Sequence, residues 1–261
     1  MHWIYLSPHL DDAALSCGGL IWEQTHAGER VTVLTVCAGI PDPAREPLSP
    51  FAQELHARWG AGPEAAAIRQ AEDVAACRVL GAAPRHLPVL DCIYRTGPDG
   101  QHIYASEQAL NGPLYPYEVA WAARLSRLRA ARLPSNAQVV CPLGLGNHVD
   151  HQLTRLAAEQ LGRPLWYYAD YPYVLKHPAA LDSLAQTGWR RQLFPIRRAG
   201  LTAWQDSVAA YTSQISTFWA DQAAMRFAIE EYASRELVVY LWQKGCGSNS
   251  GGLSQKYQQG A

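Results

Sequence analysis

The sequence has no excess of charge of either sign and no long apolar run. Its 22 Lys and Arg residues balance 23 Asp and Glu residues, giving a formal net charge of -1. Nucleic acid is bound largely through surplus basic residues, so we expect no nucleic-acid partner. No run of about 18 apolar residues occurs, so we expect no membrane span. The stretch from Met1 to Leu6 has no basic signal-peptide region, and we expect no secretory signal.

The cysteines form no recognisable framework. No CxxC pair is present, and the six residues are scattered through mostly apolar surroundings: Cys17, Cys37, Cys77, Cys92, Cys141 and Cys246. A disulfide scaffold needs a denser pattern. We therefore expect reduced cysteines that pack as small apolar residues in a cytoplasmic protein.

What is present predicts one α/β domain. The 261 residues are 48% hydrophobic and 17% charged, far from the composition of a disordered chain. Runs rich in β-branched residues alternate with segments of helical periodicity, which is typical of a Rossmann-like, mostly parallel sheet flanked by helices. The predicted strands are 3–7, 31–37, 86–90, 138–143 and 165–169. The predicted helices are 12–26, 64–80, 117–133 and 149–161, and Gly18 and Gly19 would let the first of them pack closely against a neighbour.

The alternation weakens after Gly162. We expect additional C-terminal helices over 178–187, 201–214 and 220–233, and the apolar run 237–242 is a candidate edge strand. The predicted domain covers residues 1–244, with a core over 1–170 and a C-terminal extension over 171–244. Residues 245–261 are rich in Gly, Ser and Gln, so we expect a mobile tail.

Two segments rich in proline and glycine, 38–62 and 91–116, interrupt the core. Each follows a predicted strand, so both should lie at the carboxyl edge of the sheet, where α/β proteins bind ligands. Loops of this length are commonly functional or disordered. A substrate-lining role and a purely connecting role stay open for each.

The stretch Ser7-Pro8-His9-Leu10-Asp11-Asp12 closes the first predicted strand and opens the first predicted helix. His9 and Asp12 are three residues apart, so both side chains can turn toward one point, whereas Asp11 must project differently. This arrangement allows His9 and Asp12 to hold a divalent metal while Asp11 acts on something bound to it. Helix capping would explain one aspartate, but it does not require His9.

A second cluster, Gly146-Asn147-His148-Val149-Asp150-His151, follows the fourth predicted strand. The first and fourth strands are neighbours in the commonest doubly wound orders, so the two clusters should meet. One imidazole would complete a His–Asp–His site with an open position for water, as catalytic zinc requires. The spacing does not say whether His148 or His151 is that ligand. The other would be free for acid or oxyanion work.

The paired motifs PHLDDAALSCGG and GNHVDH resemble the PIG-L/LmbE family of metal-dependent de-N-acetylases (GlcNAc-PI de-N-acetylase-like), whose usual motifs are (A/P)HPDDE and HxDH. The resemblance covers at least residues 3–165 and reaches Tyr211-Thr212-Ser213-Gln214, which is similar to a family segment ending in YxSQ. Leu10, Ala13 and Val149 depart from the family pattern, and none is a presumed ligand. Ala13 replaces an acidic residue, which puts the outer support of the metal site in doubt.

The resemblance implies a role for each residue of the two motifs. The implied Zn2+ ligands are His9, Asp12 and His151. Asp11 is implied to be the general base that acts on water at the metal. His148 is implied to protonate the leaving amine or to stabilise the oxyanion, with Asp150 orienting a histidine of its own motif.

Two further residues match family positions outside these motifs. Arg69 lies on a segment similar to a family helix whose arginine faces the substrate. Asp91 matches a position where an acidic residue commonly contacts sugar hydroxyls. The alternatives are a solvated or ion-paired helix residue for Arg69 and a simple turn residue for Asp91.

The predicted activity is removal of an N-acetyl group from an N-acetylated amino sugar or sugar conjugate, with release of acetate and a free amine. The predicted cofactor is Zn2+, and a site of two histidines and one aspartate can also accept Fe2+ or Co2+. An amidase for a larger acyl group or a thiol conjugate stays open, as does a catalytically silent binding protein of this fold. The expected partner is a small amino-sugar or glycoconjugate substrate, and the oligomeric state is left open, a homo-oligomer included.

Overall fold

Seven strands form one sheet in the computed structural model, which describes residues 1–42, 44, 47–130, 133–233 and 236–245. In chain order the strands are β1 (His2–Ser7), β2 (Arg30–Thr35), β3 (Ala83–His86), β4 (Gln138–Pro142), β5 (Leu165–Tyr168), β6 (Trp189–Pro195) and β7 (Val238–Lys244). Their order in the sheet is β3-β2-β1-β4-β5-β7-β6. The first five are parallel, whereas β7 pairs antiparallel with both of its neighbours.

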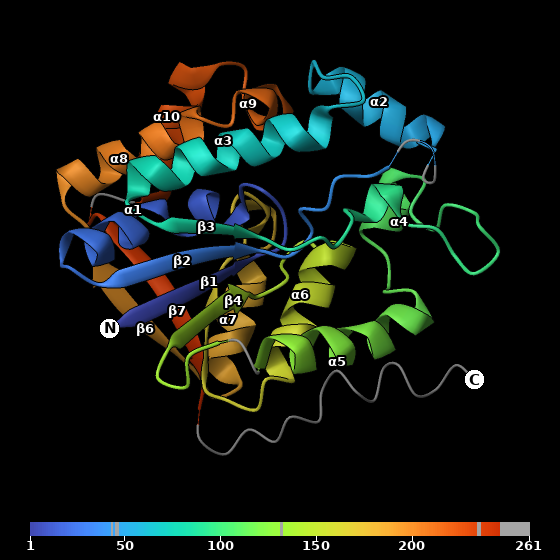
Figure 1. Cartoon of the computed structure of the whole chain (residues 1–261). Coiled ribbons are helices and arrows are strands. Elements are labelled where there is room, and N and C mark those ends of the chain that lie inside the picture. The colour runs from blue at the N-terminus through green and yellow to red at the C-terminus, as the bar shows by residue number, and fades with distance from the viewer. Residues whose placement is uncertain (43, 45–46, 131–132, 234–235, 246–261) are drawn as a thin grey trace.

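Helices cover both faces of this sheet (Figure 1). They are α1 (Asp12–His26), α2 (Pro50–Arg58), α3 (Ala65–Leu80), α4 (Glu107–Leu110), α5 (Pro116–Ala130), α6 (Val149–Glu159), α7 (Pro178–Gln186), α8 (Arg198–Ala209), α9 (Thr212–Phe218) and α10 (Gln222–Ala233), with short 3-10 turns η1 (Cys92–Tyr94) and η2 (Tyr173–Lys176). Helices α1, α3, α8 and α10 pack together over one face, and α5 and α6 lie over the other. The predicted fold class is confirmed.

The centre of the sheet follows the expected doubly wound pattern. Strand β1 is buried from Trp3 to Ser7, as its unbroken apolar run requires for a strand covered on both faces. Trp3 pairs with Gln138 and Tyr5 with Val140, so the first and fourth strands are neighbours as predicted. The chain that leaves β1 therefore emerges beside the chain that leaves β4.

The third strand was placed too late in the sequence. The ladder covers Ala83–His86 instead of 86–90. Beyond it only isolated bridges join Pro88 to Cys37 and Leu90 to Gly39. Pro88 has no N–H to donate, so the regular ladder cannot continue through it.

The C-terminal run is a strand, but the prediction that it lies at the edge is wrong. Strand β6 pairs with β7 at seven positions, from Trp189 opposite Lys244 to Pro195 opposite Val238, and forms the outer edge itself. Sequence patterning missed β6 because its middle is polar and most of its residues are exposed. Edge strands are commonly charged in this way, which discourages pairing between molecules.

The predicted helix over 201–214 is two helices, α8 and α9, separated at Ala210 and Tyr211. The turn is held by α3: the Tyr211 hydroxyl donates to Asp73 Oδ1 at 2.8 Å. Glu72 accepts from the Ser213 N–H at 2.8 Å and from the Ser213 hydroxyl at 2.6 Å. The Tyr-Thr-Ser-Gln segment therefore attaches the C-terminal helices to the core.

Helix α1 packs closely against α8 at its paired glycines, as predicted. A Cβ on Gly18 would collide with the indole of Trp204, and one on Gly19 would lie 2.8 Å from Ile196 Cδ1. Trp204 is fully buried, and its Nε1 donates to the carbonyl of Leu15 at 3.2 Å. Only glycine lets the indole lie this close to the helix axis.

Several other expectations concern what is buried or absent. Cys17, Cys37, Cys77, Cys92 and Cys141 are buried and free, whereas Cys246 lies outside the described residues. The tail prediction for 245–261 also falls outside them, except for Gly245. Within the described part of the chain, no helix combines the length and apolarity needed to span a membrane.

Candidate metal and catalytic site

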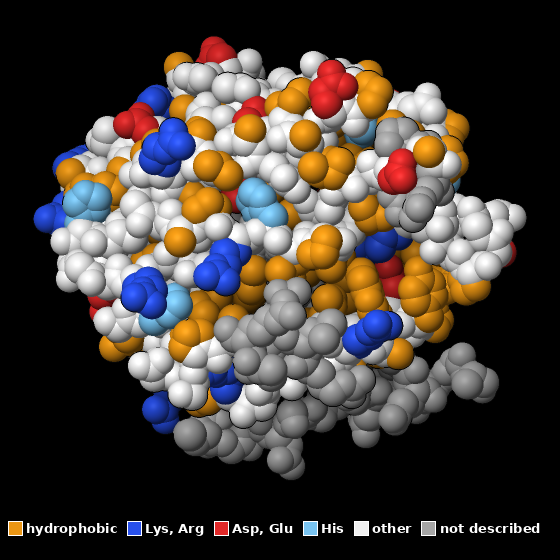
Figure 2. Space-filling view, in the orientation of Figure 1, with side chains coloured by type: hydrophobic (Ala, Val, Ile, Leu, Met, Phe, Trp, Pro, Cys, Tyr) orange, Lys and Arg blue, Asp and Glu red, His pale blue; other side chains and the backbone are white. Residues whose placement is uncertain are grey.

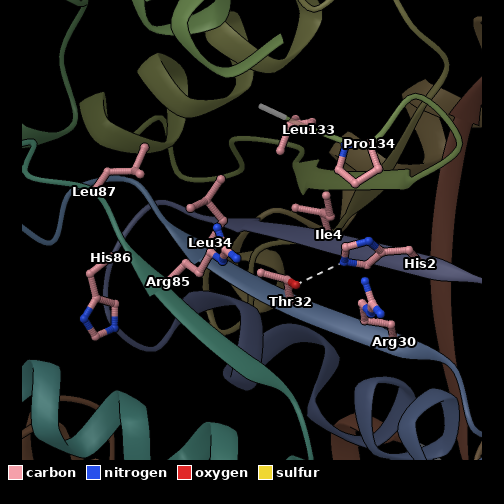
Figure 3. Close-up of a pocket in the computed structure, with 10 residues that line it drawn as sticks. All are labelled: His2, Ile4, Arg30, Thr32, Leu34, Arg85, His86, Leu87, Leu133 and Pro134. Carbon is pink, nitrogen blue, oxygen red and sulfur yellow. Dashed lines mark hydrogen bonds between the residues drawn. The ribbon is translucent and has the colours of Figure 1, made fainter. Parts of the chain in front are cut away.

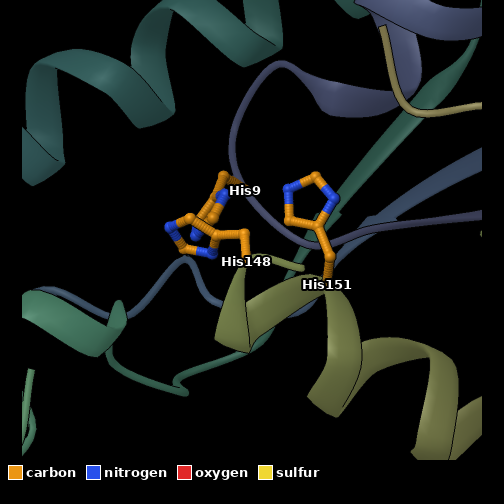
Figure 4. Close-up of side chains that lie close together, drawn as sticks. All are labelled: His9, His148 and His151. Atoms are coloured by element: carbon orange, nitrogen blue, oxygen red, sulfur yellow. The ribbon is translucent and has the colours of Figure 1, made fainter. Parts of the chain in front are cut away.

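Both predicted clusters lie at the carboxyl edge of neighbouring strands and face one another. His9, Asp11 and Asp12 follow β1, and His148, Asp150 and His151 follow β4. The ring centroids of His9 and His148 are 4.8 Å apart, and those of His148 and His151 are 5.4 Å apart. Figure 4 shows the three rings converging from the two segments. One ring nitrogen from each histidine lies within 4.8 Å of the others, a spacing that allows one metal ion to reach them.

Local hydrogen bonds shape the first cluster. The Ser7 hydroxyl donates to the His9 carbonyl at 2.7 Å and accepts from the Ala13 N–H at 3.0 Å. Asp12 Oδ2 accepts from the His9 N–H at 2.7 Å. These bonds bend the chain between strand and helix, so that the His9 and Asp12 side chains share one side.

The second cluster depends on two left-handed residues. Gly146 has φ of 84° and Asn147 has φ of 62°. Glycine takes this conformation freely, and asparagine is among the few other residues that tolerate it. The turn makes His148 the N-cap of α6, where its Nδ1 accepts from the Asp150 N–H at 3.3 Å.

Asp12 bridges two of the three histidines. Its Oδ2 lies 3.3 Å from His9 Nδ1, and its Oδ1 lies 3.3 Å from His151 Nε2. Burial disfavours the charged carboxylate, but His151 and His9 outweigh that effect and hold the pKa of Asp12 well below its usual range. Asp12 is therefore an ionised carboxylate between two imidazoles.

The donor set fits a divalent metal. His151 Nδ1 lies 2.6 Å from Asp170 Oδ1, whereas its buried Nε2 forms no regular hydrogen bond within the described residues and faces Asp12 Oδ1 at 3.3 Å. Asp170 is in turn held by the Leu145 N–H at 2.9 Å. A carboxylate on one ring nitrogen leaves the other free to bind a metal, the usual arrangement around metal-bound histidine. Two imidazoles and a carboxylate are ligands that Zn2+ accepts.

Asp170 is a site residue that the sequence analysis missed. Burial lowers the pKa of His151, but Asp12 and Asp170 outweigh it and raise that pKa to about 9. Asp170 follows β5, which is next to β4 in the sheet. The adjacency rule that joined the first and fourth strands would also have found it. It lies in an aromatic stretch, residues 166–173, in which five of the eight residues are Trp or Tyr.

Asp11 is set apart from the ligand cluster. It lines a pocket, and its Oδ2 lies 3.5 Å from Arg69 Nη2. Burial and the neighbouring Asp12 carboxylate raise the pKa of Asp11 to about 6, with Arg69 opposing them. A carboxylate poised near neutral pH suits proton transfer.

Arg69 and Asp91 meet on the same pocket wall. Arg69 is buried, stacks over the Trp59 ring at 4.8 Å, and places Nη1 3.7 Å from Asp91 Oδ2. Asp91 Oδ1 also accepts from the Ile93 N–H at 3.2 Å, which caps η1. The turn reading of Asp91 is thus correct, but its second oxygen faces the site.

Asp150 differs from its expected role. Its carboxylate contacts His9, with Oδ2 2.9 Å from His9 Nε2, and not a histidine side chain of its own motif. Only its backbone N–H orients His148. Asp150 is fully buried and does not line the pocket.

The pocket in front of Asp11 has a volume of about 290 Å3 and draws on both long loops. Segment 38–62 contains α2, which sequence patterning missed and which supplies Leu55, Arg58 and Trp59 to the wall. Segment 91–116 contributes Asp91, Ile93, Glu107, Leu110 and Asn111. The far wall comes from η2 and α9, with Tyr173, Lys176, Gln214, Thr217 and Phe218. Of the aromatic stretch 166–173, only Tyr173 lines the pocket.

A larger cleft, of about 550 Å3, lies elsewhere on the molecule. Figure 2 shows apolar side chains gathered between β3 and α5, and this cleft borders them with Ile4, Leu34 and Leu87. His2 bonds to Thr32 at 3.1 Å, and the His86 ring turns away toward Asp73, 2.7 Å distant (Figure 3). The two histidines do not converge, so the chemistry belongs to the smaller pocket.

The fold and the site together define an α/β protein with a histidine–carboxylate centre, suited to a divalent metal, at the carboxyl edge of its sheet. The family model for GlcNAc-PI de-N-acetylase, PIG-L, matches residues 4–161. The chain belongs to this family of deacetylases, which confirms the resemblance seen in the motifs.

Individual relatives agree with this assignment. The 2'-N-acetylparomamine deacetylase of Niallia circulans is 29% identical over 244 residues, which cover 85% of this chain and 83% of that protein. The zinc-inhibited form of teicoplanin deacetylase Orf2 matches with a TM-score of 0.76 and 26% identity, over 93% of this chain and 97% of the Orf2 chain. The A40926 pseudoaglycone deacetylase Dbv21 matches with a TM-score of 0.68 and 30% identity, over 92% of this chain and 95% of the Dbv21 chain. The cluster of His9, His148 and His151 and the zinc form of one relative both support a metal at this site.

Proposed function

We propose that this protein is a zinc-dependent N-deacetylase that converts an N-acetylated amino sugar or sugar conjugate into acetate and a free amine. The observation that carries the proposal is Asp11, a pocket-lining carboxylate with a raised pKa beside the His–Asp cluster. The relatives support the substrate class, because they are named as deacetylases of 2'-N-acetylparomamine, of teicoplanin and of the A40926 pseudoaglycone.

In this proposal His9, Asp12 and His151 hold the metal. A metal bound there would polarise the acetyl carbonyl and make water a better nucleophile at neutral pH. The Asp12 carboxylate supports this ligand set, because it lies 3.3 Å from both His9 Nδ1 and His151 Nε2. Fe2+ and Co2+ are alternatives, and the zinc-inhibited relative is a reason to test them.

Asp11 acts on the proton of the attacking water. The oxygen of water bonds to the acetyl carbon and one of its protons passes to Asp11. The C–N bond then breaks as Asp11 returns that proton to the leaving nitrogen, so that acetate and a free amine depart and Asp11 is again ionised. Arg69, 3.5 Å from Asp11, keeps the carboxylate partly in its ionised, proton-accepting form.

His148 faces the same pocket from the opposite side of the cluster. Its Nδ1 accepts from the Asp150 N–H, so in the neutral ring the proton sits on Nε2. That N–H can donate to the developing oxyanion or toward the leaving nitrogen. Arg69 and Asp91 form a polar wall, and we propose that they contact the hydroxyl groups of the sugar.

We also propose a cytoplasmic enzyme, since the five described cysteines are buried and free. The part of the chain before residue 245 is proposed to act as one domain, because β6 and β7 extend the same sheet as the core strands.

Acetate release from defined substrates tests the activity. Metal-stripped protein would be reloaded with Zn2+, Co2+ or Fe2+ and given N-acetylglucosamine, 2'-N-acetylparomamine and analogues with longer N-acyl chains. We expect acetate and new amine in equal amounts from an N-acetyl sugar. Faster release of a longer acid would favour the amidase alternative, and metal-loaded protein that cleaves nothing would contradict the proposal.

A further inference from the structure

A chain of buried charged side chains runs from the histidine cluster to α5. Asp150 contacts His9 through Oδ2 at 2.9 Å and Arg95 Nη1 through Oδ1 at 2.5 Å. Arg95 continues to Glu118, with Nε 2.7 Å from Oε1. The other oxygen of Glu118 accepts a short hydrogen bond from the Tyr104 hydroxyl. The sequence analysis identified none of Arg95, Tyr104 and Glu118.

These side chains are almost completely buried, and none of them lines the pocket in front of Asp11. Asp150 and Glu118 are 0% exposed, Tyr104 is 3% exposed and Arg95 is 6% exposed. Taking charges out of water is costly, and apolar residues of similar size often stabilise a fold equally well. Stability alone therefore explains this network poorly, and its contact with His9 suggests another reason.

We propose that Arg95, held in place by Glu118, is a positioning residue that fixes Asp150 against His9 in the metal site. The inference rests on the proposed function, in which His9 is a metal ligand. Each group has a second anchor: the Cys92 N–H donates to Asp150 Oδ2 at 3.0 Å, and Arg95 Nη1 donates to the Leu90 carbonyl at 3.1 Å.

The sharing of Arg95 between two carboxylates explains how changes at Arg95 or Glu118 would reach His9. Arg95 is shared by two buried carboxylates, so neither takes its full charge. Without Arg95, nothing would hold Asp150 Oδ1 at its present place, so the carboxylate would be free to turn away and His9 would lose its partner. Without the charge of Glu118, Arg95 would be drawn more fully to Asp150, which weakens the contact between Asp150 and His9. Outer partners of metal-binding histidines are worth about 10–100-fold in metal affinity.

Metal binding in the absence of substrate tests the proposal. Arg95→Met, Arg95→Lys and Glu118→Gln would be compared with wild type, with Glu23→Gln as a matched control. Glu23 also bonds an arginine, accepting from Arg197 Nε at 2.8 Å, but lies at the other end of α1. The readouts are the Co2+ dissociation constant and the visible spectrum of the bound Co2+. The kcat and KM would be measured at saturating metal.

We expect Arg95→Met to weaken Co2+ binding by about 10–100-fold and to alter the Co2+ spectrum. Arg95→Lys should recover part of the affinity, Glu118→Gln should show a smaller loss, and the control should bind as wild type. The kcat should fall while KM stays nearly constant, because the substrate wall is untouched.

Folded Arg95→Lys and Glu118→Gln proteins with wild-type Co2+ affinity and spectrum would overturn the proposal, even if Arg95→Met does not fold. If the variants bind Co2+ more weakly than wild type, as expected, but the wild-type protein releases no acetate, the proposed activity is overturned and the positioning role stands. A wild-type protein that binds no Co2+ would overturn both.

Discussion

Two adjacent aspartates with different surroundings carry the chemistry at the scale of single residues. Asp12 lies between His9 and His151, and its pKa is well below the usual range. Asp11 points to Arg69 and the pocket, and its pKa is raised to about 6. Environments that push the pKa values of neighbouring acids apart are a general way of assigning acid–base roles.

Asp11→Asn should keep the metal but lose nearly all turnover, since the amide cannot take the proton of water. General-base catalysis contributes about 10^2–10^4-fold, so kcat should fall by that factor. Metal content and acetate release would be measured together. Asp12→Asn is the matched control and should lose metal instead. A near-native rate in Asp11→Asn would rule out the base role.

Asp170→Asn should weaken metal binding by about 10–100-fold while leaving the ligands in place, because Asp170 sets the orientation of the His151 ring. Chelator competition on the purified variant measures this loss. Unchanged affinity would show that the His151 ring keeps its orientation without the charge of Asp170. This residue shows a limit of motif reading, since an isolated aspartate after a strand has no local pattern to mark it.

At the scale of elements, sequence patterns located the buried parts of the core and missed the exposed ones. Helix 12–26 was placed at its observed bounds, because its apolar positions are buried. Helix α2 and strand β6 were not predicted, since polar and apolar residues follow one another in them without a clear period. The pocket walls come largely from such elements. Hence the ligand cluster and two residues of the pocket wall, Arg69 and Asp91, could be predicted from the sequence, whereas the parts of the wall that α2 and η2 supply could not.

The close contact between α1 and α8 predicts that a larger side chain at Gly18 lowers the free energy of unfolding. Gly18→Ala should destabilise the fold by up to about 2 kcal/mol, because a clash of about 1–3 kcal/mol with Trp204 opposes a helix-propensity gain of about 1 kcal/mol. Urea unfolding measures the difference. In a Trp204→Leu background the same substitution should be neutral or stabilising. An equal cost in both backgrounds would show that the indole is not the cause.

The link between α6 and β7 should depend on pH. Glu159 accepts from Arg155 Nε at 3.1 Å and Lys244 Nζ at 2.8 Å. Burial opposes ionisation, but Arg155 and Lys244 outweigh it and hold the pKa of Glu159 below its usual range. A lowered pKa means that the stabilisation is present above the unfolded-state pKa of about 4.3 and is lost as pH falls through the folded-state value.

Glu159→Gln should therefore destabilise the protein at pH 7 by about 1–2 kcal/mol, a figure reduced for partial exposure of the pair. The difference from wild type should shrink toward zero below about pH 4. Denaturant unfolding at both pH values checks this. A difference that stays constant with pH would point to lost packing instead of lost charge.

For the whole molecule, the metal site joins two distant parts of the chain. His9 and Asp12 follow the first strand, and His151 lies about 140 residues later, so a bound ion would link the two halves of the sheet. An ion that binds only the folded state stabilises it by about 2.7 kcal/mol at a concentration 100 times its dissociation constant. For a chain of this size that corresponds to a rise in Tm of roughly 5–10 °C.

Chelation should lower the Tm by this amount, and added metal should restore it. The same measurement decides which histidine of the second motif is the ligand. In His151→Ala the metal-induced rise in Tm should vanish, whereas His148→Ala should keep it and lose turnover. The geometry allows either, since one nitrogen of each ring lies within 4.8 Å of one on His9. Loss of the shift in His148→Ala and its retention in His151→Ala would exchange the two roles, leaving His151 as the donor group and His148 as the third ligand.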